Sequence, residues 1–141
     1  METRIIVYLL SVAIGCSGSV AAPANVNLSE FQCYKLDRER LRISDEDYRT
    51  GVGLPAVFAE PRADARKVGT EPGIVFVRRP LRIENGFAEI LRRNGQLAWI
   101  ADDAVRPMRK ANGAEGGCTL TWSPDGKYVQ SRLDPGVGLR Y

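Results

Sequence analysis

Residues that could perform enzyme chemistry are few in this chain. It has no histidine among 141 residues, so it cannot form a Ser-His-Asp or Cys-His nucleophile, and it lacks the commonest zinc ligand. Asp102 and Asp103 form its only adjacent aspartate pair and remain as candidates for acid and base catalysis. The sequence places no further group beside them to complete a site, and it has no glycine-rich phosphate loop. We therefore predict that the protein is not an enzyme and uses no metal or cofactor.

Cysteine is the other reactive residue type, and two of the three cysteines form a natural pair. Cys33 and Cys118 are an even pair, which in an oxidising compartment normally becomes a disulfide. With 84 residues between them, the loop-closure model gives a stabilisation of roughly 4 to 5 kcal/mol. A catalytic or redox thiol is the alternative. Neither cysteine lies in a C-x-x-C motif and no histidine is present to activate one, so we predict a structural disulfide.

The first 22 residues have the pattern of a secretory signal peptide. Residues 5–15 form an apolar run without charge that is too short to span a bilayer, and small residues follow at 19–22. The pattern predicts cleavage after Ala22 or Ala24 and a location in the periplasm or outside the cell. The alternative is a buried N-terminal strand or helix.

The remaining cysteine lies inside this signal. Ala13-Ile14-Gly15-Cys16 resembles the lipobox at which bacterial lipoproteins are cut and acylated, except that Ala13 stands where a larger aliphatic residue is usual. On this interpretation the signal ends at residue 15 and Cys16 carries a lipid, which is the only membrane contact we expect. The alternative is that Cys16 is discarded with the signal.

Removal of the signal leaves 119 residues, which is the size of one domain with a modest core. The whole chain carries 20 basic and 17 acidic residues, a net charge of +3. This excess is too small to indicate nucleic-acid binding.

The pattern of the mature chain is typical of an all-β protein. Residues 54–110 contain short apolar runs separated by glycine, proline and asparagine, and they predict strands at 55–59, 66–69, 73–78, 86–92, 95–101 and 105–108. Asn85-Gly86 and Asn94-Gly95 predict tight turns. Before this segment, residues 23–53 form a linker and an arm, with a strand at 31–36, a solvated charged stretch at 37–42 and an acidic turn at 44–48. After it, residues 111–141 form a hairpin extension with its turn at Ser123-Pro124-Asp125-Gly126.

The order of motifs in residues 54–110 resembles the bacterial SH3-like domain of the SH3b type. The motifs are Ala59-Glu60-Pro61, Val68-Gly69-Thr70, Gly73-Ile74-Val75, Asn85-Gly86-Phe87, Asn94-Gly95 and Trp99-Ile100. The resemblance covers under half of the chain, and Ala98 stands where the family usually has glycine. It implies a small SH3-like β-barrel, flanked by an N-terminal arm and a C-terminal hairpin that the disulfide joins. It also implies a short helical turn after Ala101, which an aspartate would cap.

Within this barrel we expect a single core and no room for a ligand, so any ligand must bind in a surface groove or on a loop. The expected core residues are Val57, Val68, Phe76, Ile90, Ile100 and Val105.

Two surface features are candidates for binding. Hairpin geometry could gather five arginines into one basic face, namely Arg78, Arg79, Arg82, Arg92 and Arg93. The alternative is a set of solvated charges that keep the domain soluble. Trp99 could line the groove that SH3-like barrels use for peptides, whereas we expect Trp122 to pack the hairpin onto the barrel. We predict ligand contacts at Arg78, Arg79, Arg82 and Trp99.

The resemblance implies a non-catalytic module of the cell envelope that binds peptidoglycan, or a peptide or protein of the periplasm. A secreted inhibitor or immunity-type protein, which blocks a partner enzyme with its loops, is the alternative. A carboxylate enzyme that uses Asp102 or Asp103 is the third hypothesis.

Overall fold

A computed structural model describes residues 26–114 and 116–137 of the chain. The predicted signal peptide, its cleavage positions and the candidate lipidation site Cys16 lie outside the described residues.

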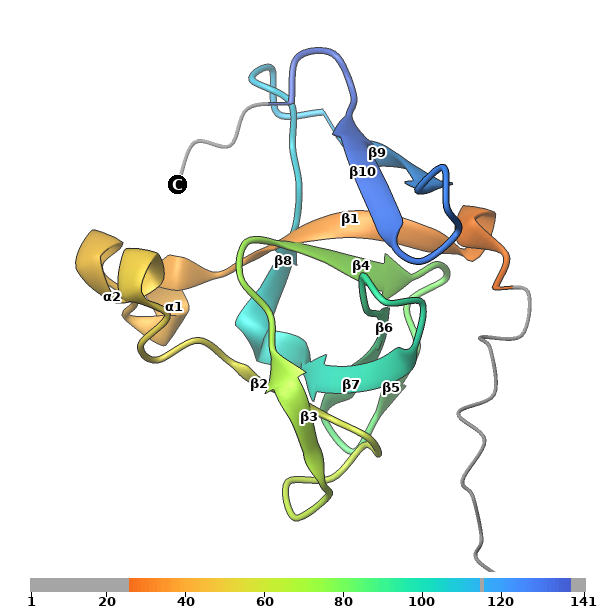
Figure 1. Cartoon of the computed structure of the whole chain (residues 1–141). Coiled ribbons are helices and arrows are strands. Elements are labelled where there is room, and N and C mark those ends of the chain that lie inside the picture. Colours follow the sequence, from red (N-terminus) through yellow and green to blue (C-terminus); the bar gives the residue numbers. More distant parts are fainter. Residues whose placement is uncertain (1–25, 115, 138–141) are drawn as a thin grey trace, which may run out of the picture.

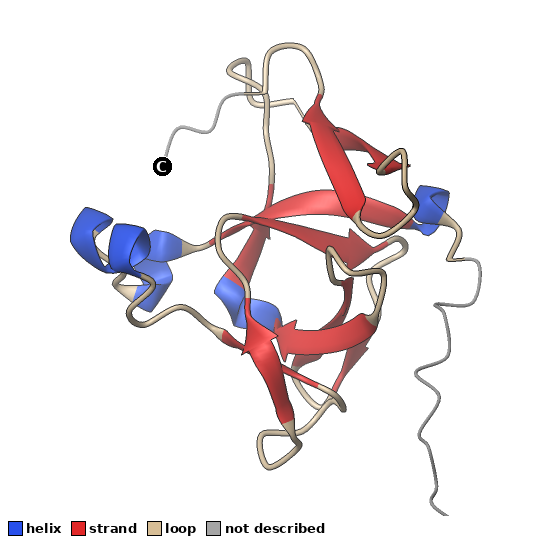
Figure 2. Ribbon diagram, viewed as in Figure 1, coloured by secondary structure: helices blue, strands red, loops and turns tan. Residues whose placement is uncertain are grey.

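The protein is mostly β-sheet with few helices, which confirms the predicted all-β class (Figures 1 and 2). A curved antiparallel sheet has the strand order β3-β2-β7-β6-β4-β1-β8, and β5 pairs with β6. Its strands are β1 (Phe31–Leu36), β2 (Ala56–Phe58), β3 (Lys67–Thr70), β4 (Ile74–Arg78), β5 (Ile83–Glu84), β6 (Phe87–Leu91), β7 (Leu97–Ala101) and β8 (Val105–Pro107). A separate hairpin consists of β9 (Cys118–Trp122) and β10 (Val129–Leu133).

The three predicted tight turns are confirmed, and each uses a residue that tolerates positive φ. Asn85 and Gly86 join β5 to β6 with φ values of 50° and 78°, which only a few residue types adopt readily. Gly95 has φ of 81° in the turn between β6 and β7. In the C-terminal hairpin the amide of Gly126 donates to the carbonyl of Ser123 at 2.8 Å.

The predicted strand at 31–36 is present, but it does not stand apart from the main sheet. β1 pairs with β4 from Phe31 to Lys35 and with β8 from Tyr34 to Leu36. The segment that we assigned to an N-terminal arm thus supplies a strand between β4 and β8. Local pattern cannot reveal this pairing, because both partners of β1 lie more than thirty residues away along the chain.

The rest of the arm is more ordered than we expected. The solvated stretch contains α1 (Arg38–Leu41), and the expected acidic turn is α2 (Asp45–Thr50). Ser44 caps α2, since its hydroxyl accepts from the amide of Asp47 while the Asp47 carboxylate accepts from the Ser44 amide. Two 3-10 turns complete the helical elements, η1 (Leu28–Glu30) and η2 (Asp102–Ala104). None of the helices in the described residues is long and apolar enough to cross a membrane.

The concave side of the main sheet encloses the inner core. All the expected core residues are buried except Val68, which is half-exposed and packs against the edge of the inner core. Phe76 is buried as well, but not in this core. The inner core consists of Leu36, Val57, Val75, Val77, Ala88, Ile90, Ala98, Ile100, Ala104 and Val105.

A second core lies on the outer side of the same sheet, beneath the C-terminal hairpin. Along β6 the residues from Ala88 to Leu91 are all buried, although successive side chains of a strand point to opposite faces. On the outer face the hairpin covers Leu91, and the side chains of Arg78 and Arg82 lie against Glu89. This outer core consists of Phe31, Cys33, Phe76, Leu91, Met108 and Val129, with Trp122 packed against it as predicted.

The predicted disulfide between Cys33 and Cys118 is confirmed, and it joins β1 to β9 with the Cα atoms 5.7 Å apart. Cys33 is itself a member of the outer core. The bond therefore fastens the hairpin directly over the apolar surface that it covers.

Reduction of this disulfide should lower the melting temperature markedly, because the loop-closure model assigns it roughly 4 to 5 kcal/mol. The measurement is thermal unfolding followed by circular dichroism, with and without reductant. A Cys33→Ala, Cys118→Ala double variant is the control and should not respond to reductant. An unchanged melting temperature for the natural chain in reductant would contradict this prediction.

The buried side chains of the outer core should contribute strongly to the stability of the protein. Met108 is 1% exposed, so we expect Met108→Ala to lower the free energy of unfolding by about 2 to 5 kcal/mol. Leu97→Ala is the control, because Leu97 is 45% exposed and its truncation should cost less than about 0.5 kcal/mol. Both values come from urea unfolding. Equal effects for the two variants would mean that the hairpin does not pack as described.

A candidate binding cleft between β1 and the hairpin

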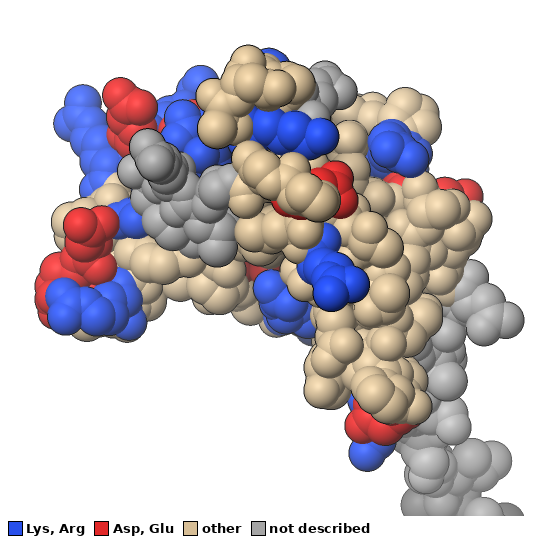
Figure 3. All heavy atoms as spheres, turned by 90° about the horizontal axis from the view of Figure 1, so that it is seen from above, with Lys and Arg blue, Asp and Glu red and all other residues tan. Residues whose placement is uncertain are grey.

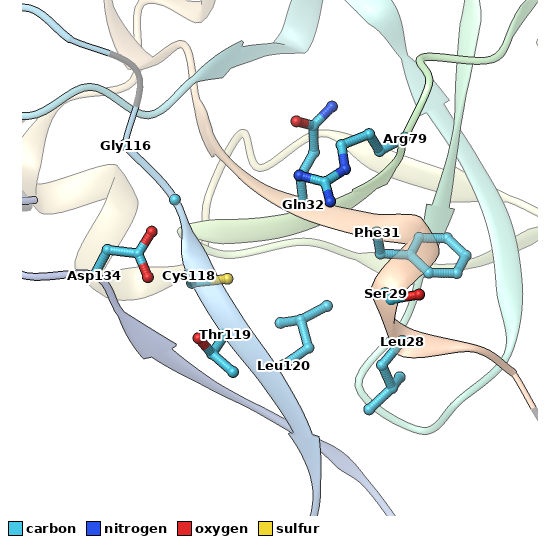
Figure 4. Close-up of a pocket in the computed structure, with 11 residues that line it drawn as sticks. Leu28, Ser29, Phe31, Gln32, Arg79, Gly116, Cys118, Thr119, Leu120 and Asp134 are labelled. Atoms are coloured by element: carbon cyan, nitrogen blue, oxygen red, sulfur yellow. The ribbon is translucent and has the colours of Figure 1, made fainter.

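The candidate site is a cleft of about 450 Å³ between the start of β1 and strand β9 (Figure 4). One wall comes from η1, β1 and the residue after β4, and the other comes from β9 and the segments beside it. Leu28 and Leu120, both half-buried, supply apolar surface, and Cys118 brings the disulfide to the lining. The cleft lies outside the inner core, at the surface of the protein.

Arg79 is the charged residue on the first wall. It follows β4 directly, its amide donates to the carbonyl of Glu30 at 2.7 Å, and its side chain is exposed. Within the described part of the chain, Arg79 has no ion pair with an acidic side chain. Its guanidinium therefore presents an uncompensated positive charge and several hydrogen-bond donors to the cleft.

Asp134 lies on the opposite side of the cleft from Arg79 (Figure 4). Its amide donates to the carbonyl of Gly117 at 3.0 Å, which holds the segment after β10 against the segment before β9. Gln32 adds an amide side chain near Arg79. The cleft thus offers a cation at one side, an anion at the other and apolar surface between them.

The other predicted arginines do not share this wall. Arg78 and Arg82 converge on Glu89, whose side chain is 5% exposed, and Arg82 reaches it with Nη1 at 3.1 Å from Oε1. Arg78 also pairs with Glu30, and Arg82 with Glu84. The hydrogen bond to Glu84 first, and then the charge of Glu89, raise the pKa of Arg82 above its usual value. Both guanidiniums are therefore compensated within the protein.

Trp99 belongs to the same compensated cluster and not to the cleft. It is 8% exposed, and the guanidinium carbon of Arg82 lies 5.2 Å from the centre of its ring. Glu89 and Trp99 are partners across β6 and β7, which explains how the three side chains meet. Trp99 thus has an aromatic face occupied by a cation of its own chain.

The five arginines considered for a basic face have different surroundings in the described structure. Arg93 stacks on Phe76, and Arg92 lies close to Gly69. On the face seen in Figure 3, lysine and arginine side chains form separate spots with acidic groups among them. Only Arg79, among the three arginines predicted to contact a ligand, reaches the cleft.

Burial shifts the pKa of two further charged groups, and both groups lie away from the cleft. Burial raises the pKa of Glu71, and the positive charges of Arg92 and Arg93 oppose that rise. Burial and then the charge of Arg106 lower the pKa of Lys35. Neither group lines the cleft, so we assign them no part in it.

The aspartate pair lies in the helical turn that we expected after Ala101. The turn is η2, but Ala101 is at its N-cap and no side chain caps it, so the predicted aspartate cap is wrong. The Asp103 carboxylate instead accepts from Nη2 of Arg40 at 3.1 Å. Among the described residues no group of three or more histidine, cysteine, aspartate or glutamate side chains is placed to hold a metal ion.

The sequence contained little that would indicate Gln32, Leu120 and Asp134 as cleft residues. Asp134-Pro135-Gly136 indicates a turn, but the residues alone do not reveal what the turn faces. These side chains meet Arg79 only because the hairpin folds back onto β1.

Glu89 should be a structural residue, because its removal leaves two arginines without their shared carboxylate. We expect Glu89→Gln to lower the free energy of unfolding by about 2 kcal/mol or more. This is a small effect for a buried ion pair, because both arginines can still reach solvent. Glu84→Gln is the matched control, and its exposed pair should contribute less than about 1 kcal/mol. Urea unfolding of both variants tests this, and equal stabilities would contradict it.

Taken together, the cleft residues can hold a polar chain that carries a carboxylate, with Arg79 as its anchor. Gln32 can add neutral hydrogen bonds, and the apolar surface between the charged sides can receive aliphatic groups. Comparison of this chain with protein-family models, with curated proteins and with solved structures gave no match.

Proposed function

We propose that this protein is an exported, non-catalytic binding module of the bacterial cell envelope whose ligand places a carboxylate against Arg79. The observation that carries the proposal is an uncompensated guanidinium on the wall of a preformed cleft, in a protein whose other predicted contact arginines are compensated. A planar guanidinium donates two parallel hydrogen bonds to a carboxylate, which gives both affinity and orientation.

The proposed location rests on two features. The first 22 residues have the pattern of a signal peptide, and the disulfide between Cys33 and Cys118 is of the kind that persists in oxidising compartments. Attachment to a membrane through Cys16 remains part of this proposal as the alternative to a soluble mature protein.

An SH3-like barrel is the proposed fold of residues 54–110. Short antiparallel strands around one inner core, the Asn85-Gly86 and Asn94-Gly95 turns, and the 3-10 turn before β8 all support it. The insertion of β1 between β4 and β8 adds a strand from outside that segment.

The ligand class that fits the cleft is a peptide with a carboxylate. Two sources in the envelope have this chemistry, the stem peptides of peptidoglycan and segments of periplasmic proteins. Asp134 on the opposite side suits a ligand that also carries an amino group or another hydrogen-bond donor. A peptide is therefore a better match than a purely anionic polymer, which Asp134 would repel.

The test is co-sedimentation of the oxidised protein with purified peptidoglycan at low and physiological salt, with an Arg79→Glu variant. We expect saturable binding that survives physiological salt and weakens by about tenfold or more in the variant, because a hydrogen-bonded charge pair contributes about 1.5 to 3 kcal/mol. Arg132→Glu is the matched control, since Arg132 is exposed on β10 and does not line the cleft.

The outcomes distinguish the two sources of the ligand, and one of them would contradict the assignment of the site to the cleft. Equal binding by wild type and Arg79→Glu would contradict the assigned site. Absence of sedimentation at both salts would exclude the wall as the source, and titration calorimetry with synthetic peptides that end in glutamate then tests the protein-derived source. Failure of both arms would contradict the proposed function, and tight stoichiometric binding to an enzyme would favour the inhibitor.

A further inference from the structure

Strand β9 has an unpaired outer edge, and its hydrogen-bonding register can be fixed. The amide of Ser123 donates to the carbonyl of Tyr128 at 2.8 Å, and the amide of Asp134 donates to the carbonyl of Gly117 at 3.0 Å. Backbone groups of an antiparallel strand alternate in direction, so odd-numbered residues of β9 bond to β10. The N–H and C=O groups of Cys118, Leu120 and Trp122 therefore point to the outer edge. β10 is the only strand beside β9 among the described strands.

Strand β1, whose start forms the other wall of the cleft, is paired with β8 over most of its length. The amide of Arg79 bonds to Glu30 and the amide of Leu36 bonds to Gly73, so even-numbered residues of β1 bond toward β4. On the other side β8 pairs with residues 34–36. Because Tyr34 pairs with Pro107, the Cys33 carbonyl faces the amide of Met108, and within β1 only Phe31 lies beyond this pairing.

The edge of β9 also lacks the features that protect exposed strands. Natural sheets guard their edges with charged side chains and proline, which discourage pairing with another chain. In the main sheet, edge strand β3 carries Lys67, and edge strand β8 carries Arg106 and Pro107. Strand β9 reads Cys-Thr-Leu-Thr-Trp, without charge or proline and with two β-branched residues that favour extended pairing.

We propose that the ligand is an extended peptide that adds as a strand to the outer edge of β9, with its carboxylate against Arg79. This inference rests on the proposed function and specifies how the ligand binds. Alternating N–H and C=O groups on the protein match the backbone of a peptide, whereas the glycan strands of a cell wall lack that repeat. Main-chain bonds would supply affinity, and Arg79 and Asp134 would select peptides by charge.

The cleft lies beside the first part of the β9 edge. Of β9, residues 118–120 line the cleft, and the disulfide brings the Cα atoms of Cys118 and Cys33 within 5.7 Å of each other, so the added strand would pair with β9 from Leu120 toward Trp122. Side chains of the added strand would alternate between solvent and the apolar surface of Leu28 and Leu120. The disulfide at one end holds β9 and β1 at a fixed separation before the ligand arrives.

The experiment is amide hydrogen exchange by NMR on the oxidised, ¹⁵N-labelled protein. The probe is a pool of acetylated hexapeptides with glutamate at the C-terminal position and alanine, valine, threonine or lysine elsewhere. At saturation we expect exchange at the amides of Leu120 and Trp122 to slow by about tenfold or more. Exchange at Thr119 and Thr121 should not change, because these amides already bond to β10.

A second pool with every other peptide nitrogen methylated is the matched control, since it has the same charges but cannot complete a ladder. It should bind at least tenfold more weakly. Equal binding of both pools, or slowing at Thr119 equal to that at Leu120, would overturn strand addition. If Arg79→Glu still abolishes binding in that case, the proposed function stands without this mode. If neither pool nor peptidoglycan binds, both proposals fail.

Discussion

The structure depends on the packing of one short hairpin against the outer face of the main sheet. Without β9 and β10, the side chains of Phe76, Leu91 and Met108 would face water on a sheet that already buries its other side. The hairpin has no core of its own, and an isolated two-stranded hairpin is at best marginally stable in water. The sheet and the hairpin therefore need each other, and the disulfide between Cys33 and Cys118 adds a covalent link between them.

Burial on both faces explains the charged cluster beside the hairpin. Glu89 lies on the outer face of β6, and its neighbours along the strand are buried. Its carboxylate is therefore shielded from water, and its negative charge needs a positive partner within the protein. Arg78 and Arg82 supply that compensation. Arg79 follows Arg78 immediately, but alternation along the chain turns it away from Glu89 and toward the cleft. Two neighbouring arginines thus differ completely in the charge they present to solvent.

Local features of the fold were predictable from the sequence, whereas long-range packing was not. The turns at Asn85-Gly86 and Asn94-Gly95 depend on residues that tolerate positive φ, so they could be located without a structure. The cysteine pair followed from residue type and compartment. The second core could not be inferred, because alternation in β4 and β6 places Phe76 and Leu91 on the face opposite Val77 and Ile90 and gives no sign of what covers it. For the same reason Arg78, Arg79 and Arg82 looked equivalent in the sequence, and only the position of Glu89 separates them.

The outer core and the cleft are two consequences of the same hairpin placement. Cys33 is a member of the outer core and Cys118 lines the cleft, so one covalent bond fixes both the packing of the hairpin and the separation of the cleft walls. A cleft whose walls are fixed in advance spares its ligand part of the entropy that ordering two segments would cost. β9 also meets the outer core with its side chains while its outward backbone groups stay unpaired, so the strand can stabilise the fold with one set of groups and bind with another. The backbone edge that we propose for binding is thus separate from the side chains that stabilise the fold, whereas Leu120 belongs to the cleft and also packs against the outer core.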